Sequence, residues 1–314
     1  MQGSIQMHRP ADKAWDVIIV GGGLAGLSLA VQLSDAGPFE ILVVDKVTRP
    51  VPEGAFKVGE SMVEVGSLYL RDIVGLGEHL LADHLPKFGL RFFASHGDNS
   101  DIASRLEYGP FAIGPIDGPF RGLPVPTWNV DRGRLENRLA GRCRDAGVTL
   151  VDGAHAVAIE LGVPVGRGSR PPHRVTLEDG RHFDARWLVD ATGPATVLAR
   201  QEGLIEGDAH RTHAAWFRVE GEIDPEAWSA DPAWLARTHP GLRRLSTNHL
   251  VGAGYWVWLI PLSSGSTSVG IVTLPSRHPP AETNRLERAL TFLKTREPQL
   301  AAHLEGARIL DFQV

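Results

Sequence analysis

Residues 15–45, WDVIIVGGGLAGLSLAVQLSDAGPFEILVVD, contain the pattern that decides the fold. The apolar run at 15–20 is typical of a buried parallel strand. Apolar residues recur at helical spacing over 24–36, and Gly37 is suited to end a helix there. A second apolar run follows at 41–44. The stretch therefore predicts a strand–helix–strand unit with a glycine turn after its first strand.

The glycine turn fits the G-x-G-x-x-G pattern of dinucleotide-binding proteins. The first glycine allows a tight turn, the second lets the backbone approach a diphosphate, and the third lets helix and strand pack closely. The helix N-terminus offers N–H groups to phosphates, and an acid after the second strand suits a ribose. The motif does not separate FAD from NAD, and a tight turn without a ligand is the alternative. The candidate cofactor-binding residues here are Gly21, Gly23, Leu24, Ala25, Gly26, Asp45 and Lys46.

Composition narrows the function classes. The chain has 314 residues and a net charge of −5, and it has no Lys/Arg-rich run, which argues against nucleic-acid binding. Its single cysteine, Cys143, forms neither an intrachain disulfide nor a multi-cysteine metal site, and it lies in a helical pattern that favours a structural role. No apolar run approaches the roughly 20 residues of a membrane span. We expect a cytoplasmic protein without a metal.

The remaining patterns predict a second domain. Longer strands are expected at 214–219, 255–260 and 267–273, and helices at 131–146 and 282–293. These favour an α/β fold with a Rossmann-like domain and an inserted, mainly β, substrate domain. The chain ends within an apolar pattern, so we expect a C-terminally truncated protein. The predicted segments are 15–86 and 127–205 for the dinucleotide domain, 87–126 and 206–304 for the substrate domain, and 305–314 for the start of a returning, truncated strand.

Six motifs together resemble a known family. They are the glycine turn, KVGES at 57–61, KFGLRF at 87–92, VDR at 130–132, VDATG at 189–193 and WVWLIP at 256–261. The chain resembles the flavin-dependent halogenases, within the FAD monooxygenase fold of hydroxybenzoate hydroxylase, over about residues 15–275. The W-x-W-x-I-P match is the most specific of these motifs. The resemblance implies a Rossmann-like FAD-binding domain with FAD as the cofactor.

The resemblance also implies an activity. Proteins of this family use reduced FAD, O2 and halide to make hypohalous acid, which reaches a lysine beside the organic substrate. By resemblance that lysine is Lys87, and a free amine there requires a lowered pKa, because an unperturbed lysine is neutral in about one part in 2,500 at pH 7. A solvated lysine at a strand edge is the alternative. The implied partners are halide, a small-molecule substrate that is free or tethered to a carrier, and a separate flavin reductase.

Further site residues follow from the same resemblance. Glu60 and Ser61 lie on the loop that resembles the flavin-facing loop, and Glu60 is a second catalytic candidate. Arg132 resembles an arginine that contacts the FAD phosphates, a task suited to a guanidinium. Gly193 is expected to allow close approach to the cofactor, whereas Asp190 favours a structural role beside it. The implied flavin-side wall consists of Trp256, Trp258 and Pro261; Trp256 and Trp258 alternate along one strand and thus share a face, as core aromatics also do.

Three functions remain open at this point. The first is halogenation. The second is a flavin hydroxylase, epoxidase or prenyl reductase-like flavoprotein without halide chemistry. The third is an inactive truncated flavoprotein, because the resemblance places the family's second flavin-contacting segment and its halide loop after residue 314.

Overall fold

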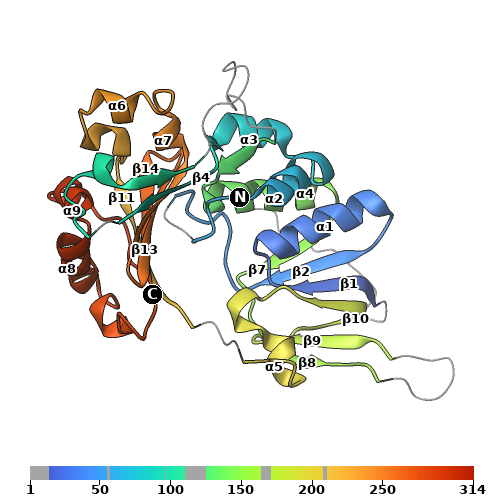
Figure 1. Cartoon of the computed structure of the whole chain (residues 1–314). Helices are drawn as coiled ribbons and strands as arrows, with labels where there is room; N and C mark the ends of the chain where they lie inside the picture. Colours follow the sequence, from blue (N-terminus) through green and yellow to red (C-terminus); the bar gives the residue numbers. More distant parts are fainter. Residues whose placement is uncertain (1–13, 55–56, 96, 110–124, 164–170, 208–210) are drawn as a thin grey trace. The chain divides into compact units, whose positions relative to one another are not determined.

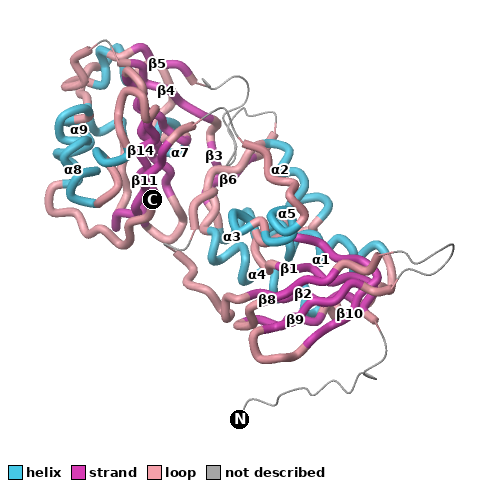
Figure 2. The backbone as a smooth tube through the Cα atoms, turned by 90° about the horizontal axis from the view of Figure 1, so that it is seen from below, coloured by secondary structure: helices cyan, strands magenta, loops and turns pink. Residues whose placement is uncertain are grey.

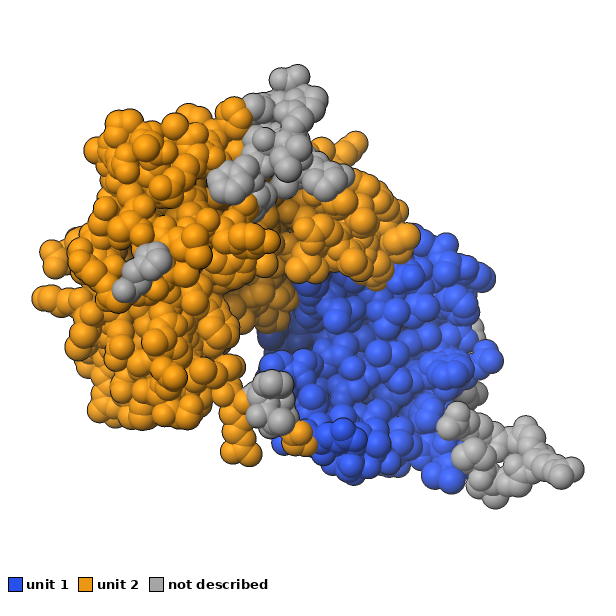
Figure 3. Space-filling view, in the orientation of Figure 1, with its two compact units in different colours: residues 1–51, 135–206 blue, residues 52–134, 207–314 orange. Residues whose placement is uncertain are grey.

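The computed structural model describes residues 14–314 except 55–56, 96, 110–124, 164–170 and 208–210. The chain divides into two compact units (Figure 3). Unit 1 comprises Met1–Val51 and Leu135–Glu206, and unit 2 comprises Pro52–Arg134 and Gly207–Val314. The segment Pro52–Arg134 thus clusters with unit 2, whereas the sequence interpretation gave residues 52–86 and 127–134 to the dinucleotide domain. The functional assignment of the two domains stays a prediction.

Unit 1 is built on a six-stranded sheet of order β7-β2-β1-β10-β9-β8 (Figures 1 and 2). The first four strands run parallel, and the last two pair antiparallel. This arrangement confirms the predicted α/β fold. The strands are β1 (Trp15–Val20), β2 (Ile41–Asp45), β7 (Thr149–Asp152), β8 (Ala156–Glu160), β9 (His173–Leu177) and β10 (His182–Asp190).

Helix α1 (Leu24–Ala36) joins β1 to β2 as the sequence predicts. Its buried residues include Leu27, Ala30 and Val31. These lie at positions i, i+3 and i+4, which share one face of a helix. The sequence also predicts a buried strand at 187–190, but this end of β10 is partly exposed, with Trp187 65% exposed. Unit 1 also contains the 3-10 turn Gly193–Ala195, α5 (Val197–Gln201) and most of α4 (Arg132–Asp145).

Unit 2 is built on a second six-stranded sheet, of order β11-β14-β13-β12-β4-β5. The sequence predicts a strand over 88–94, but the observed strand begins only at Leu90, and Gly89, with φ +68°, lies between it and the short strand Leu85–Lys87. Strand β12 was not expected, and it pairs parallel with β4. The strands are β4 (Leu90–Ala94), β5 (Leu106–Tyr108), β11 (His213–Glu220), β12 (Thr247–Gly252), β13 (Tyr255–Pro261) and β14 (Ser266–Thr273).

The two faces of this second sheet differ. One face packs on α8 (Leu286–Arg296) and α9 (Pro298–Leu304) in a buried core that includes Phe93, Phe217 and Leu250. Because side chains alternate along strands, the neighbouring residues point to the opposite face. That face carries the half-buried residues Phe92, Trp216, His249, Trp256 and Trp258.

Smaller elements complete unit 2. A two-stranded sheet joins β3 (Leu85–Lys87) to β6 (Thr127–Asn129). The sequence predicts a further helix around residues 62–72, and the structure has α2 (Glu64–Leu68), which continues as a π-helical turn, Tyr69–Ile73. Residues 305–314 contain only isolated bridges to β11, formed by Ile309 and Gln313. The other elements are α3 (Gly77–Asp83), α6 (Pro232–Leu235), α7 (Leu242–Leu245) and the 3-10 turns Ile102–Ser104, Pro225–Trp228 and Pro280–Glu282.

Candidate functional site

The glycine turn of unit 1 has no room for side chains. A Cβ on Gly21, which has φ +107°, would lie 2.2 Å from the carbonyl oxygen of Ala191. A Cβ on Gly26 would lie 2.0 Å from the carbonyl oxygen of Gly21. Gly23 is the N-cap of α1, and no side chain caps this helix end. The first-turn N–H groups, at Leu24 and after, are thus of the kind that bind phosphates at helix N-termini.

Asp45 lies at the end of β2 beside this turn. A Cβ on Gly22 would be 2.7 Å from Asp45 Oδ2, so a larger residue there would have to displace the Asp45 side chain. Arg49 donates from Nη2 to Asp45 Oδ2 at 2.8 Å and also to the carbonyl oxygen of Gly22. The Arg49 side chain is only 3% exposed. The sequence did not indicate Arg49, because no motif marks an arginine four residues after the acid. The predicted cofactor-binding residue Lys46 is exposed.

At the end of β10, Asp190 binds the following turn. Its Oδ1 accepts hydrogen bonds from Thr192 N at 3.0 Å and Oγ1 at 2.6 Å, and its Oδ2 accepts one from Leu198 N at 2.8 Å. Burial acts to raise the pKa of Asp190, but these hydrogen bonds prevail and lower it. Asp190 therefore holds the entry to α5. Gly193 has φ +62°, a backbone conformation that favours glycine. A Cβ there would meet open space, so no contact within the described residues requires glycine at this position.

In unit 2, the 57–61 loop carries a buried carboxylate. Glu60 is 1% exposed. Its Oε1 accepts from Arg218 Nε at 3.0 Å, and its Oε2 accepts from Ser268 Oγ at 3.2 Å. Burial raises the pKa of Glu60, against the lowering effect of the Arg218 charge and hydrogen bonds. Arg218 also donates from Nη1 to Asp311 Oδ2 at 2.5 Å.

Lys87 ends strand β3 and is 3% exposed. Its Nζ donates to the carbonyl oxygen of Met62 at 2.7 Å. Burial lowers the pKa of Lys87 to about 8, although the charge of Glu64 acts in the opposite direction. The alternative of a solvated lysine at a strand edge is therefore wrong.

Ser61 and a histidine lie near this lysine. The Ser61 hydroxyl is 2.7 Å from the hydroxyl of Thr247, which in turn donates to Asn129 Oδ1 at 3.3 Å. His249 stacks on Phe92 with ring centroids 4.8 Å apart. Burial lowers the pKa of His249, and the positive charge of Lys87 adds to this effect. Sequence reasoning missed Thr247 and His249 because strand β12 itself was not expected.

Arg132 begins α4 and binds the 57–61 loop directly. Its Nη1 donates to the carbonyl oxygen of Val58 at 2.9 Å. The neighbouring Asp131 is 1% exposed, and it accepts hydrogen bonds from Ser263 Oγ and from Ser264 N and Oγ at 2.7–2.9 Å. The start of α4 thus fixes the loop and the β13–β14 turn together.

The predicted wall residues lie on β13. Trp256 and Trp258 are half-buried on one face of the strand, as the alternation predicts, and Pro261 is buried. Trp258 donates from Nε1 to Ser268 Oγ at 3.2 Å. Unit 2 thus brings Trp258 and Glu60 to the same serine, whereas the glycine turn, Asp45 and Asp190 belong to unit 1.

Two other features are separate from these residues. Cys143 is fully buried and donates from Sγ to the carbonyl oxygen of Leu27 at 3.5 Å, and burial raises the pKa of its thiol to about 12.

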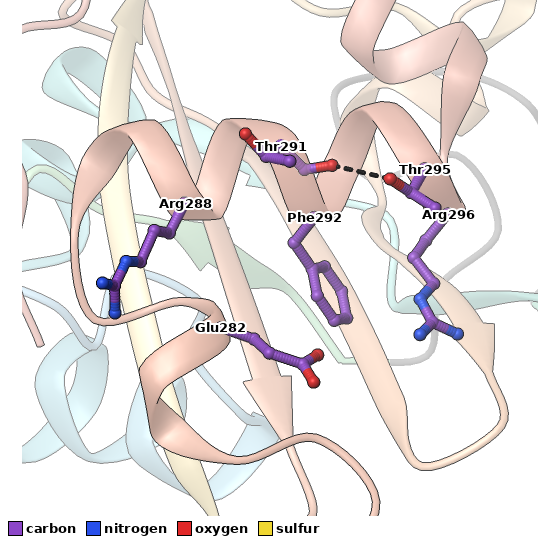
Figure 4. A pocket seen from close by; sticks show the side chains of 6 residues that line it. All are labelled: Glu282, Arg288, Thr291, Phe292, Thr295 and Arg296. Carbon is purple, nitrogen blue, oxygen red and sulfur yellow. Dashed lines mark hydrogen bonds between the residues drawn. The ribbon is translucent and has the colours of Figure 1, made fainter.

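A surface pocket of about 300 Å³ lies along α8 in unit 2 (Figure 4), and none of the sequence-predicted site residues lines it. Its lining residues are Glu282, Arg288, Thr291, Phe292, Thr295 and Arg296.

The fold and the glycine turn define a dinucleotide-binding protein, and comparison with known families identifies the dinucleotide. The family model described as "FAD binding domain" matches residues 14–285, so the chain belongs to this family. FAD is accordingly its cofactor, as the sequence predicts. The described turn fits FAD, because the absence of side chains at Gly21 and Gly26 lets α1 begin close to the end of β1, and no side chain caps the N–H groups at its start.

Similar proteins are flavin-dependent halogenases, which confirms the resemblance. Flavin-dependent halogenase chlA of Dictyostelium discoideum is 25% identical over 95% of this chain and 51% of its own length. A 1H-pyrrole-2-carbonyl-(peptidyl-carrier protein) chlorinase of Pseudomonas fluorescens is 25% identical over 91% of this chain and 62% of its own length. The crystal structure of halogenase PltM shares the fold, with TM-score 0.76, 21% identity, and coverage of 95% of this chain and 59% of that one.

The chain thus spans about half to three fifths of the length of these relatives. Across the part of the chain that the structure describes, no helix has the length and apolar character needed to cross a membrane.

Proposed function

We propose that the protein containing this chain is an FAD-dependent halogenase that uses reduced FAD, O2 and halide to halogenate an organic substrate through Lys87. The observation that carries the proposal is the buried ammonium group of Lys87, whose pKa is lowered to about 8. Its motif, KFGLRF, lies in a chain whose relatives are named as halogenases. A buried lysine with a lowered pKa is a marker of a functional site rather than of a solvated surface.

The lowered pKa gives Lys87 two usable forms. At pH 7 a lysine with a pKa of about 8 is neutral in roughly one molecule in ten, compared with about one in 2,500 for an ordinary lysine. The ammonium form donates a hydrogen bond to the oxygen of hypohalous acid. The amine form takes up halogen from hypohalous acid, with N–H replaced by N–halogen and water released. Either form delivers the halogen at the position of Nζ.

The chain's own residues suit the cofactor. In this proposal the backbone at Gly21–Gly26 and the N-terminus of α1 hold the FAD diphosphate, and Asp45 holds the ribose. Arg132, Ser61 and Glu60 are assigned to the flavin side by resemblance, as are Gly193 and the wall of Trp256, Trp258 and Pro261. When reduced, FAD supplies the two electrons that O2 accepts.

The partners are part of the same proposal. Two similar proteins are named for pyrrole groups on a peptidyl-carrier protein, which supports a small-molecule substrate tethered to a carrier. Halide and a separate flavin reductase complete the reaction, and a cytoplasmic location stays a prediction.

The alternative is a flavin monooxygenase without halide chemistry, and one substitution separates the two. The protein is supplied with reduced FAD, O2, bromide and a panel of phenols and pyrroles, and products are identified by mass spectrometry. The Lys87→Ala variant is expected to lose brominated product at least about tenfold while it still consumes O2. A Lys294→Ala variant is the control, because Lys294 is exposed on α8.

Brominated product at an unchanged rate from Lys87→Ala would reject the lysine mechanism. Hydroxylated product without bromination in the wild type would favour the monooxygenase. If neither product forms although FAD is bound, the third alternative, an inactive flavoprotein, is favoured instead.

A further inference from the structure

The indole of Trp258 lies flat across the neighbouring strand. Trp258 on β13 stands opposite Gly270 on β14 in the antiparallel pair. A Cβ on Gly270 would lie 2.1 Å from Cζ2 of the indole and 2.2 Å from Cε2. No side chain larger than hydrogen fits under the ring in this orientation. Gly270 has an ordinary φ, so contact with the ring, and not backbone conformation, requires glycine here.

A hydrogen-bond chain fixes the edge of the same indole. The indole Nε1–H is a donor only, and it donates to Ser268 Oγ at 3.2 Å. Ser268 therefore accepts from the indole and directs its own proton to Glu60 Oε2, at 3.2 Å. The donors in these two hydrogen bonds therefore all point the same way, from Trp258 through Ser268 to the carboxylate of Glu60 on the 57–61 loop.

The far end of this chain is anchored. Glu60 Oε1 lies 2.8 Å from Arg218 Nη2, and both side chains are 1% exposed. Arg218 is fixed in turn by Asp311, which accepts from its backbone N at 2.7 Å and from Nη1 at 2.5 Å. Both oxygens of Glu60 are thus engaged within the protein, which favours a positioning role for Glu60 over proton transfer.

We propose that Ser268 and Gly270 are positioning residues that fix the Trp258 indole and couple it to Glu60 on the 57–61 loop. All of these residues belong to unit 2. Gly270 sets the plane of the ring and Ser268 sets its rotation about χ2. The consequence for reactivity rests on the proposed function: a fixed indole keeps the substrate on the Lys87 route and suppresses direct oxygenation and loss of hydrogen peroxide.

Two measurements without turnover test the positioning. The first is a double-mutant cycle on thermal unfolding with Gly270→Ala and Trp258→Ala. Gly270→Ala is expected to lower Tm by several degrees in the wild type and to have little effect in the Trp258→Ala background. Gly141→Ala is the control: a Cβ there meets nothing within 4 Å, and alanine is favoured over glycine inside a helix, so this variant is expected not to lower Tm. Equal losses in both backgrounds would overturn the role of Gly270.

The second measurement addresses Ser268 and does not depend on Gly270→Ala folding. The near-UV circular dichroism of Trp258 is obtained as the difference between wild type and Trp258→Phe. Ser268→Ala is expected to change this difference spectrum, and Ser268→Thr, which keeps the hydroxyl, is expected to restore it. An unchanged spectrum in Ser268→Ala would overturn the coupling.

A third measurement tests the consequence for reactivity. Ser268→Ala is expected to raise the ratio of hydrogen peroxide to halogenated product at least about threefold, and Ser268→Thr to return it toward the wild-type value. If the wild type halogenates and Ser268→Ala gives the same ratio of hydrogen peroxide to halogenated product, this consequence is overturned. If the wild type gives no halogenated product, the proposed function fails, while the unfolding cycle and the spectra still decide the positioning.

Discussion

The Glu60 carboxylate and the Arg218 guanidinium form an ion pair in which Oε1 lies 2.8 Å from Nη2 and each side chain is 1% exposed. Desolvation of such a pair is costly, and the pair is tolerated because both partners are present and hydrogen-bonded. Removal of one partner leaves the other charge buried without compensation.

Arg218→Met is therefore expected to lower the free energy of unfolding by about 3–5 kcal/mol, measured by urea denaturation. The exposed pair Arg308–Glu220, at 3.3 Å and 73% and 58% exposed, supplies the control. Arg308→Ala should cost less than about 1 kcal/mol, since solvent screens exposed pairs. Similar losses in the two variants would contradict the buried-pair argument.

Lys87 predicts a pH dependence of stability. The folded-state pKa of about 8 lies below the ordinary value of 10.5, so between these values the unfolded chain binds more protons than the native one. Stability should then rise with pH across this window and stay flat below pH 8. The lowered pKa corresponds to a change of about 3 kcal/mol in the free energy of unfolding, at 1.36 kcal/mol per pH unit. The measurement is the difference in the free energy of unfolding between wild type and Lys87→Met, followed over pH 7–10.5. A constant difference would show that Lys87 has an ordinary pKa.

The glycine turn predicts different costs at two glycines with positive φ. Gly21→Ala places a Cβ 2.2 Å from a backbone oxygen, whereas Gly193→Ala meets open space. Gly193→Ala should cost roughly 1–2 kcal/mol, the price of the left-handed conformation alone. Gly21→Ala should cost more than about 3 kcal/mol and also weaken FAD binding, which fluorescence titration measures. Equal effects would argue against the packing of the turn on Ala191.

Cys143 should be unreactive in the folded protein. With its pKa at about 12, the thiolate fraction at pH 8 is roughly one in ten thousand. Ellman's reagent is expected to modify Cys143 only after denaturation. Rapid modification of the native protein would mean that the thiol is accessible.

Much of the fold follows from local sequence patterns. The limits predicted for the first strand and for the first helix match those of β1 and α1, because a buried strand, a glycine turn and an amphipathic helix each depend on near neighbours in the chain. Strand β12 was missed although it pairs with the adjacent β13. Its other pairing, with β4, joins residues that lie 157 positions apart, such as Leu250 and Phe93, and local sequence does not indicate such a contact. The break at Gly89 was missed for a local reason, because a single glycine in an apolar run predicts a turn only weakly.

The strand–helix–strand unit and the shared face of Trp256 and Trp258 could be predicted from the amino-acid sequence, because each depends on spacing along one segment. The FAD family could be predicted from six motifs in order along the chain. Only the tertiary structure decided that Lys87 is buried against Met62 and that Glu60 meets Arg218 and Ser268. Burial and hydrogen-bond partners depend on which distant segments pack together, and that packing sets the pKa of Lys87 and the orientation of Trp258.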